Sequence, residues 1–281
     1  MQIQTLRLPR PQQKGWLAVT ALCGFGLACF VCGVAPAAAQ SRLEAQYEAT
    51  LAGIAVGKGA WNIKIQDDQF SAAASGGTSR LVKTFTGGSG SGGSQGRVVN
   101  GALVATNYRV SITTSKKAEE THIALVNGNV KESGIVPEPP TDPARIPVTD
   151  AQHHGVVDPM TAALVHVPGT GEVLTPEACH TSAPVFDGRM RYDLKLEFKR
   201  METVKAAKGY RGPVVVCAIY FVPVAGYIPD QPVTRYLTAQ RNMEVALAPI
   251  AGTRILVPFW MKMPTPLGQA KLEATSFITQ P

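Results

Sequence analysis

Hydrophobic and polar residues alternate along much of this chain. In residues 41–66, every second position is apolar on both sides of a stretch that contains Gly53, Gly57 and Gly59. A period of two is typical of strands with one buried face, and glycines between two such runs mark a turn. We therefore predict an antiparallel hairpin at the start of this region.

Residues 98–133 contain two further hairpin signals. Asn100-Gly101 and Asn127-Gly128 each separate two runs with apolar residues at alternate positions. Asn-Gly is a strong signal for a two-residue hairpin turn, because both residues must adopt positive φ. This segment predicts a meander of antiparallel strands with a polar turn at residues 116–120.

More strands are predicted in the C-terminal half. Asp187-Gly188 indicates a turn, and residues 189–199 alternate between apolar and polar side chains. Residues 209–227 are more continuously apolar, which favours a more deeply buried strand. Residues 236–278 predict three further strands separated by glycine or proline.

One helix is predicted between these regions. Asp158 precedes Pro159, a pair typical of a helix N-cap and the first helical residue. The apolar residues that follow share one helical face: Met160, Ala163, Leu164 and Val167. We expect a short helix that packs against the sheet.

Two segments of biased composition predict loops. Residues 87–96, GGSGSGGSQG, have almost nothing to bury, so we expect a flexible loop. A phosphate-binding loop is the alternative, but the Lys-Ser/Thr ending of such loops is missing. Residues 137–147 are rich in proline and predict an extended loop, which is the best candidate for a boundary between two domains. A single domain is preferred because each half alone would leave open sheet edges.

The composition agrees with many short strands and turns. The chain has 27 glycines, 21 prolines and only 17% charged residues. We predict a mainly β fold, in which residues 40–281 form a single domain. Its architecture is expected to be a curved antiparallel sheet or half-open β-barrel with one short helix packed against it.

Residues 1–39 have the features of a signal peptide. Basic residues precede an apolar run at residues 16–34, and small residues before Gln40 form an A-x-A cleavage site. We expect cleavage after Ala39 and a periplasmic or secreted mature protein that does not span a membrane. An uncleaved anchor is the alternative, because the apolar run is nearly long enough to cross a bilayer.

Charge argues against one class of partner. The net charge of +7 falls to +4 without the leader, since residues 40–281 contain 24 basic and 20 acidic residues. No dense stripe of lysine and arginine with interleaved aromatic residues is present, which disfavours nucleic-acid binding.

Two cysteines, Cys179 and Cys217, lie outside the predicted leader. An even pair in an exported chain predicts a disulfide, and two free buried thiols are the alternative. Closing a loop of 38 residues (217 − 179) would stabilise the fold by about 4 kcal/mol in the chain-entropy model. Without a C-x-x-C motif, we expect a structural role.

The best candidate for a catalytic or metal site is the cluster of His153, His154 and Asp158. Adjacent histidines in a strand point to opposite faces, and no third histidine or cysteine lies nearby at ligand spacing. A solvated loop before a capped helix is therefore favoured, whereas convergence of the three side chains in a cleft would indicate an enzyme. We expect no enzymatic activity, no cofactor and no metal.

A hydrophobic groove is the main functional hypothesis. Residues 258–264, PFWMKMP, are rich in methionine and aromatic residues, which line apolar ligand sites. Ordinary core packing is the alternative. The aromatic residues predicted for the interior and for this groove are Trp61, Tyr192, Phe198, Tyr220, Phe259 and Trp260.

Several segments resemble the bacterial family called domain of unknown function 3108. They are YEATLAGIAVGKGAWNIKI (47–65), DPMTAALVHV (158–167), the C…FDGRMRYDLKL…C arrangement in residues 179–217, and TPLGQAKLEATSF (265–277). The resemblance covers most of the chain after the leader. It implies a secreted or periplasmic, mainly antiparallel β protein, and the family offers no established activity or catalytic residues to carry over.

Together these observations predict a periplasmic cell-envelope protein that binds a lipid, a lipoprotein or another hydrophobic ligand in a groove of the sheet. The alternative is a structural or interaction module that binds another envelope protein or peptidoglycan through its loops and sheet edges.

Overall fold

The computed structural model describes residues 40–79 and 87–281. The predicted signal peptide, residues 1–39, lies outside the described residues, as does the segment 80–86. No helix in the described part of the chain is long and apolar enough to cross a membrane.

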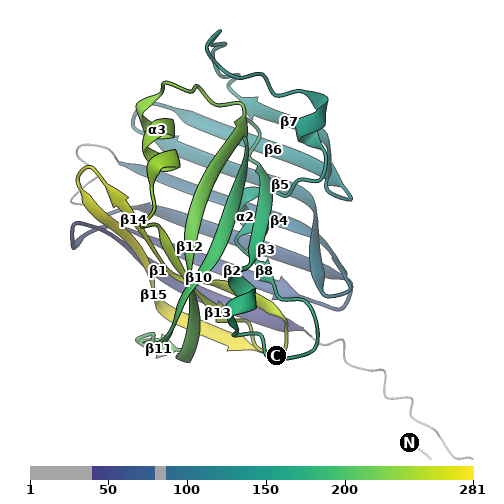
Figure 1. The fold of residues 1–281 in the computed structure, drawn as a ribbon, viewed down its shortest axis with the longest axis vertical. Coiled ribbons are helices and arrows are strands. Elements are labelled where there is room, and N and C mark those ends of the chain that lie inside the picture. Colours follow the sequence, from purple (N-terminus) through teal and green to yellow (C-terminus); the bar gives the residue numbers. More distant parts are fainter. Residues whose placement is uncertain (1–39, 80–86) are drawn as a thin grey trace, which may run out of the picture. The chain divides into compact units, whose positions relative to one another are not determined.

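Fifteen strands of the described residues form one sheet that is almost entirely antiparallel (Figure 1). The first seven follow one another in chain order: β1 (Ser41–Leu51), β2 (Ile54–Ile65), β3 (Gln69–Thr78), β4 (Gly88–Val99), β5 (Ala102–Thr114), β6 (Ala118–Val126) and β7 (Asn129–Val136). The others are β8 (Val165–His166), β9 (Thr181–Phe186), β10 (Arg191–Lys205), β11 (Lys208–Gly209), β12 (Arg211–Ala225), β13 (Glu244–Pro249), β14 (Ile255–Thr265) and β15 (Gly268–Gln280).

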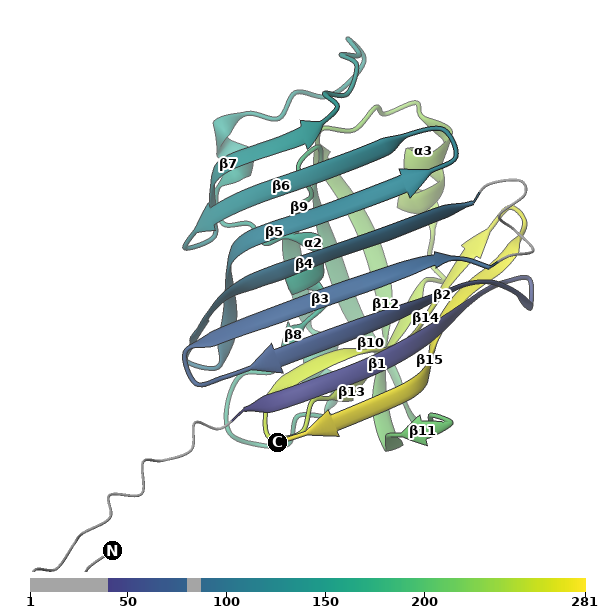
Figure 2. The ribbon, with the colours of Figure 1, turned by 180° about the vertical axis from the view of Figure 1, so that it is seen from behind.

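The two ends of the sheet are not joined to each other. The strand order is β7-β6-β5-β4-β3-β2-β1-β15-β14-β13-β12-β10-β9, with β11 paired to β15 and β8 paired to β14. Strands β1 to β7 form a broad layer, and the long strands β10 and β12 cross in front of it in Figure 1 and behind it in Figure 2. The predicted class, a mainly β, curved antiparallel sheet or half-open barrel, is confirmed.

Two short α-helices accompany the sheet in the described residues: α2 (Pro159–Ala162) and α3 (Pro232–Ala239). Two 3₁₀ helices are also present: η1 (Asp150–His153) and η2 (Pro176–Cys179). Helix α2 begins at Asp158 as predicted but makes only one turn, because the chain then pairs with β14 as strand β8. Helix α3 includes residues 236–239, which were predicted as strand, so that part of the prediction is wrong.

The predicted Asn-Gly turns are confirmed. Asn100 and Gly101 have φ values of 52° and 78°, and Asn127 and Gly128 have values of 51° and 75°. Both pairs therefore have the positive φ angles that a two-residue hairpin requires. The first hairpin turns earlier than expected, at residues 52–53, and the two later glycines of that region lie inside β2.

The glycine-rich segment is a strand, so its prediction as a flexible loop is wrong. Residues 88–99 form β4, which pairs with β3 on one side and with β5 on the other. Its backbone hydrogen bonds to two neighbours specify the strand without large side chains of its own. A Cβ at Gly96 would overlap the Val104 carbonyl and lie 2.8 Å from the Phe70 ring, so one position needs glycine for close packing. The proline-rich residues 137–147 contain no helix or strand.

Residues 214–218 of strand β12 are buried on both faces, as the continuous apolar sequence predicted. Val214 and Val216 belong to the main core, which also contains Phe259 and Phe277. The alternate residues of β12 belong to a second hydrophobic cluster: Val215 and Cys217, with Val167, Ala178, Cys179, Val245, Leu247 and Leu256.

Candidate functional site

An apolar pocket of about 300 Å³ lies between helix α2 and the strands β9, β10, β12, β13 and β14. Its volume is at the lower end of the range for small-molecule sites. Helix α2 and the residues after it contribute Thr161 to His166. The aliphatic side chains of the facing strands are Leu194, Leu196, Ile219, Val245, Leu247 and Met261.

Asp158 fixes helix α2 in this position. The Asp158 side chain is fully buried, and its Oδ1 accepts hydrogen bonds from the backbone N–H groups of Met160 (2.9 Å) and Thr161 (3.0 Å). Its Oδ2 accepts hydrogen bonds from the hydroxyls of Ser94 on β4 (2.9 Å) and Thr161 (2.6 Å). The N-cap therefore also attaches the helix to the glycine-rich strand.

This buried polar cluster has shifted pKa values. Burial raises the pKa of Asp158, and the hydrogen bonds from Thr161, Ser94 and Met160 oppose that shift. Burial, followed by the negative charges of Asp158 and Asp187, raises the pKa of Tyr108 to about 12. All oxygens of the Asp158 carboxyl are already hydrogen bonded, so the geometry assigns this group to holding the helix.

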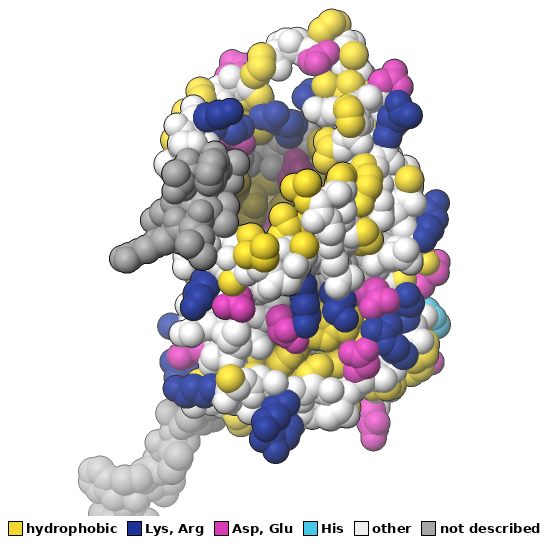
Figure 3. All heavy atoms as spheres, turned by 90° about the vertical axis from the view of Figure 1, so that its left-hand side faces the viewer, with side chains coloured by type: hydrophobic (Ala, Val, Ile, Leu, Met, Phe, Trp, Pro, Cys, Tyr) yellow, Lys and Arg dark blue, Asp and Glu magenta, His cyan; other side chains and the backbone are white. Residues whose placement is uncertain are grey.

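Met261 is one of the pocket-lining residues that are exposed, together with Thr181 and Ser182. Met261 lines the pocket and is 39% exposed, and Leu272, its partner on β15, is 36% exposed. Met263, two residues further along β14, is 38% exposed. We call the side chains of Met261, Met263 and Leu272 the mouth. Figure 3 shows a hollow on the side of the molecule that lies at the left in Figure 1, with hydrophobic side chains along one part of its edge and Lys or Arg side chains along another.

Glycines reduce the side-chain volume at the end of the sheet where the mouth lies. Gly59, Gly76 and Gly90 are successive cross-strand partners on β2, β3 and β4, so they share a face. The row begins with the buried Tyr47 of β1 and ends with Ile112 of β5, which is 44% exposed. This part of the sheet therefore carries few side chains that would fill the concave face.

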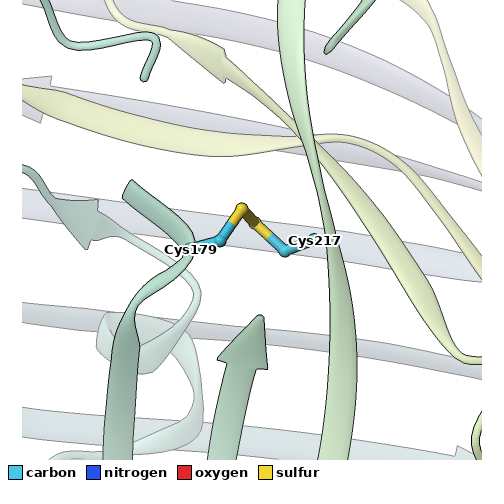
Figure 4. The surroundings of a disulfide bond; sticks show 2 residues. All are labelled: Cys179 and Cys217. Atoms are coloured by element: carbon cyan, nitrogen blue, oxygen red, sulfur yellow. A yellow bond between two sulfur atoms is a disulfide. The ribbon is translucent and has the colours of Figure 1, made fainter. Parts of the chain in front are cut away.

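The disulfide supports one side of the pocket. Cys179 and Cys217 are bonded, as predicted, with their Cα atoms 5.5 Å apart (Figure 4). The bond ties η2 to β12, and both residues are fully buried. Thr181 and Ser182, which line the pocket, follow Cys179 almost directly.

Arg254 holds the segment before η2. Its Nε donates to the Val167 carbonyl (2.7 Å) and its Nη1 donates to the Gly171 carbonyl (2.6 Å). His166 lines the pocket next to this segment, and its pKa is lowered by burial first and by the Arg254 charge second. The neutral imidazole is therefore favoured beside the apolar cavity.

Two of the six predicted groove residues, Phe259 and Trp260, belong to the main core, and a third packs against it. Phe259 packs against Phe277 with ring centroids 5.5 Å apart, and Trp260 lies under the Lys262 ammonium at 4.2 Å. Trp61 packs against the same core, and its Nε1 is buried without a hydrogen-bond partner.

The other three lie in separate places. Phe198 packs against the second cluster. The Tyr192 ring contacts the Phe221 ring, with 5.1 Å between centroids. The Cζ atom of Arg241 lies 6.0 Å from the centroid of the Tyr220 ring. None of the six predicted residues lines the pocket. The lining of this pocket is mainly aliphatic, so it is a different candidate groove from the aromatic one that the sequence predicts.

The side chains of His153, His154 and Asp158 do not converge on one site. The His153 ring packs edge-on against Phe186 of β9 (4.9 Å between centroids), whereas His154 Nδ1 lies 2.9 Å from Asn129 Oδ1 on β7. Asp158 caps α2 instead of facing either ring. Among residues 40–79 and 87–281, no three His, Cys, Asp or Glu side chains are grouped to hold a metal ion.

The segment with these histidines connects the two ends of the sheet. Val156 N–H donates to the Gly128 carbonyl at the β6–β7 hairpin (2.7 Å), and Val157 N–H donates to the Pro184 carbonyl of β9 (2.9 Å). Residues 153–157 therefore bridge the gap between the terminal strands of the sheet.

A wider hollow of about 720 Å³ lies over β1 to β5. Its lining consists mainly of small and polar residues, including Ser75, Ser89 and Ser91. The pocket next to α2 is the better candidate for a ligand site because apolar side chains converge on it from several elements.

Comparison with known proteins gives a family and a distant structural similarity. The model of the family described as "Protein of unknown function (DUF3108)" matches residues 46–275. The chain is also similar to a crystal structure described as a β-barrel-like protein of domain of unknown function DUF1849 from Brucella abortus. That similarity has a TM-score of 0.46 at 8% sequence identity and covers 85% of this chain and 98% of the other. No curated protein matches the chain.

Proposed function

The chain belongs to the DUF3108 family, and we propose that it is a periplasmic cell-envelope protein that binds a hydrophobic ligand, such as the acyl chain of a lipid, in the pocket next to α2. The observation that carries this proposal is the convergence of aliphatic side chains from β10, β12, β13 and β14 on one cavity. An alkyl chain that enters such a cavity gains about 0.8 kcal/mol for each CH₂ group that leaves water.

The polar groups of the pocket support an apolar ligand. The Thr161 hydroxyl is engaged with Asp158 and Ser94, so it is already satisfied. The burial-lowered pKa of His166 favours its uncharged form. The polar groups of a strongly polar or charged ligand would find no hydrogen-bond partners in this cavity. Burying such groups costs roughly several kcal/mol.

The disulfide supports an oxidising compartment. Cytosolic thiols are kept reduced, whereas disulfides persist in the periplasm and outside the cell. The buried Cys179–Cys217 bond agrees with the predicted leader in residues 1–39, whose cleavage after Ala39 is part of this proposal.

We propose binding as the activity, without catalysis, cofactor or metal. The carboxyl nearest to the pocket, Asp158, caps a helix through four hydrogen bonds. The histidines that precede it bridge two strands through Phe186 and Asn129.

A titration with a fluorescent fatty acid tests the proposal. Ala183 of β9 lines the pocket and pairs with Leu194, so Ala183→Trp should fill the cavity. Lys195, the next residue of β10, is exposed, and Lys195→Trp is the matched control. We expect saturable binding by the wild type and the control, and at least about tenfold weaker binding by Ala183→Trp. The proposal is wrong if the wild type shows no saturable binding, or if both folded variants bind equally well.

The alternative, an interaction module for an envelope protein or peptidoglycan, is supported by strand β7. This strand ends the sheet order, and Val136 at its end is 62% exposed. Lys131 and Glu132 lie on the same edge strand, and such charges oppose pairing with another strand, which counts against this alternative. Cross-linking in intact cells that captures one protein through β7, with no acyl ligand bound, would favour this alternative.

A further inference from the structure

Two hairpin tips carry the most exposed large hydrophobic side chains of the described residues. Leu267 in the β14–β15 turn is 76% exposed, and Ile54 at the start of β2 is 65% exposed. The two tips are adjacent, because the Ala52 N–H donates to the Gln269 carbonyl (2.9 Å). Both hairpins end on the same side of the sheet in Figure 1 and in Figure 2.

The tips continue into the mouth of the pocket. Met263 and Met261 follow the Leu267 turn back along β14, and Leu272 faces Met261 from β15. All three mouth residues are more than one-third exposed. Exposed apolar side chains therefore lie both at the hairpin tips and, beyond Thr265, at the mouth of the pocket.

We propose that the Ile54 and Leu267 tips insert into the surface of an anionic lipid bilayer and thereby place the pocket mouth against the membrane. This inference rests on the proposed function, because it supplies the source of the acyl ligand. A ligand that leaves the bilayer at the tips would meet Met263 and Met261 along β14 before it enters the pocket.

The shape of this surface favours a bilayer over a protein partner. A stable protein interface buries about 800 Å² on each partner, with a packed apolar centre. Two protruding hairpin tips do not offer such a flat area, but a few apolar side chains are enough to anchor a protein in the interfacial region of a membrane.

The charges near the tips favour anionic lipids. Within residues 48–58 and 262–273, three lysines (58, 262 and 271) face two acidic residues, Glu48 and Glu273. Lys271 is paired with Glu273, so Lys58 and Lys262 are the lysines left to meet headgroups. Long lysine side chains behind an inserted tip can extend toward headgroups, and anionic lipids attract them.

Vesicle co-sedimentation tests this inference with protein purified from the periplasm. The test variant is Ile54→Asp with Leu267→Asp. The matched control is Val99→Asp with Val126→Asp, since these valines are 42% and 50% exposed beside the two Asn-Gly turns at the opposite end of the sheet. On vesicles of phosphatidylethanolamine and phosphatidylglycerol, we expect at least about tenfold weaker binding by the test variant and unchanged binding by the control.

Three results would overturn the inference. They are no vesicle binding by the wild type, an equal loss in both variants, and a wild-type dimer that the test variant abolishes while vesicle binding persists. The fluorescent fatty acid titration without vesicles separates this inference from the proposed function. The tip variant should bind the fatty acid normally. A wild type that binds the fatty acid but not the vesicles would refute the membrane inference alone.

Discussion

Ser94 of strand β4 donates a 2.9 Å hydrogen bond to the fully buried carboxyl group of Asp158, the residue that caps helix α2. A serine from a segment that consists mostly of glycine and serine thus holds the helix that forms one wall of the pocket. The glycine-rich strand positions the candidate site, although its composition is typical of a linker.

Removal of this hydrogen bond should destabilise the protein. Ser94→Ala leaves Asp158 Oδ2 with Thr161 as its remaining hydroxyl partner, in a site without solvent. We expect a loss of about 2 kcal/mol in the free energy of unfolding, measured with a chemical denaturant. Ser91→Ala on the same strand is the control, because Ser91 is exposed, and it should change stability by less than about 0.5 kcal/mol. Equal effects of the two substitutions would contradict the assigned role of Ser94.

The stability of the wild type should depend on pH through Asp158. Burial raises the folded-state pKa of this carboxyl above its unfolded value of about 3.9, so the folded protein holds the proton more tightly. The contribution to stability is fully present below the unfolded pKa, and it is lost as pH rises through the folded pKa. Asp158→Asn removes the titrating group and keeps an oxygen that can accept the capping hydrogen bonds.

The measurement is the free energy of unfolding of both proteins from about pH 3 to about pH 8. As pH rises, the wild type should lose stability relative to Asp158→Asn, by at most about 1.4 kcal/mol per pH unit. A difference that stays constant, or one that grows in favour of the wild type, would show that Asp158 is not destabilised by burial.

Loss of the disulfide should weaken the pocket wall as well as the fold. Cys179→Ser with Cys217→Ser opens a loop of 38 residues and leaves two hydroxyls in a fully buried cluster. We expect a loss of up to about 4 kcal/mol in the free energy of unfolding. Fatty acid affinity should also fall, because the residues after Cys179 line the pocket. Unchanged affinity in a folded variant would separate the disulfide from the site.

Glycine should be required at Gly96 but not at Gly77. A Cβ on Gly96 would collide with the Val104 backbone, whereas a Cβ on Gly77 would be at ordinary contact distance, 3.4 Å from the Gly88 carbonyl. Gly96→Ala should therefore cost about 2 kcal/mol or more, and Gly77→Ala should be nearly neutral. Thermal unfolding compares them directly, and similar melting temperatures would argue against close packing of β4 on β5.

Local sequence signals predicted the local geometry well. Asn and Gly readily adopt the positive φ that a two-residue hairpin turn requires, as at residues 100–101 and 127–128. The Asp158 side chain caps the nearby backbone N–H groups, and Pro159 suits the first helical position. The Cys179–Cys217 bond was predictable because these two cysteines are the only ones outside the predicted leader.

The features that depend on distant partners were not predictable in this way. Strand β4 is specified by β3 and β5, which lie on either side of it, so its own composition pointed to a loop. The pocket collects aliphatic residues such as Leu194, Val245 and Met261 from separate strands. The large aromatic residues Phe259 and Trp260 had suggested a groove, but they lie in the core, where burial of their large apolar surface stabilises the fold.

Photoaffinity labelling with a diazirine fatty acid, followed by peptide mapping, tests the central claim most directly. If the pocket next to α2 holds the acyl chain, the label should appear on peptides that contain Leu196, Leu247 and Met261, and excess unlabelled fatty acid should remove it. Ala183→Trp should prevent this labelling while Lys195→Trp should not. Label confined to the wider hollow around Ser75 and Ser89, or no label that competitor removes, would contradict the account.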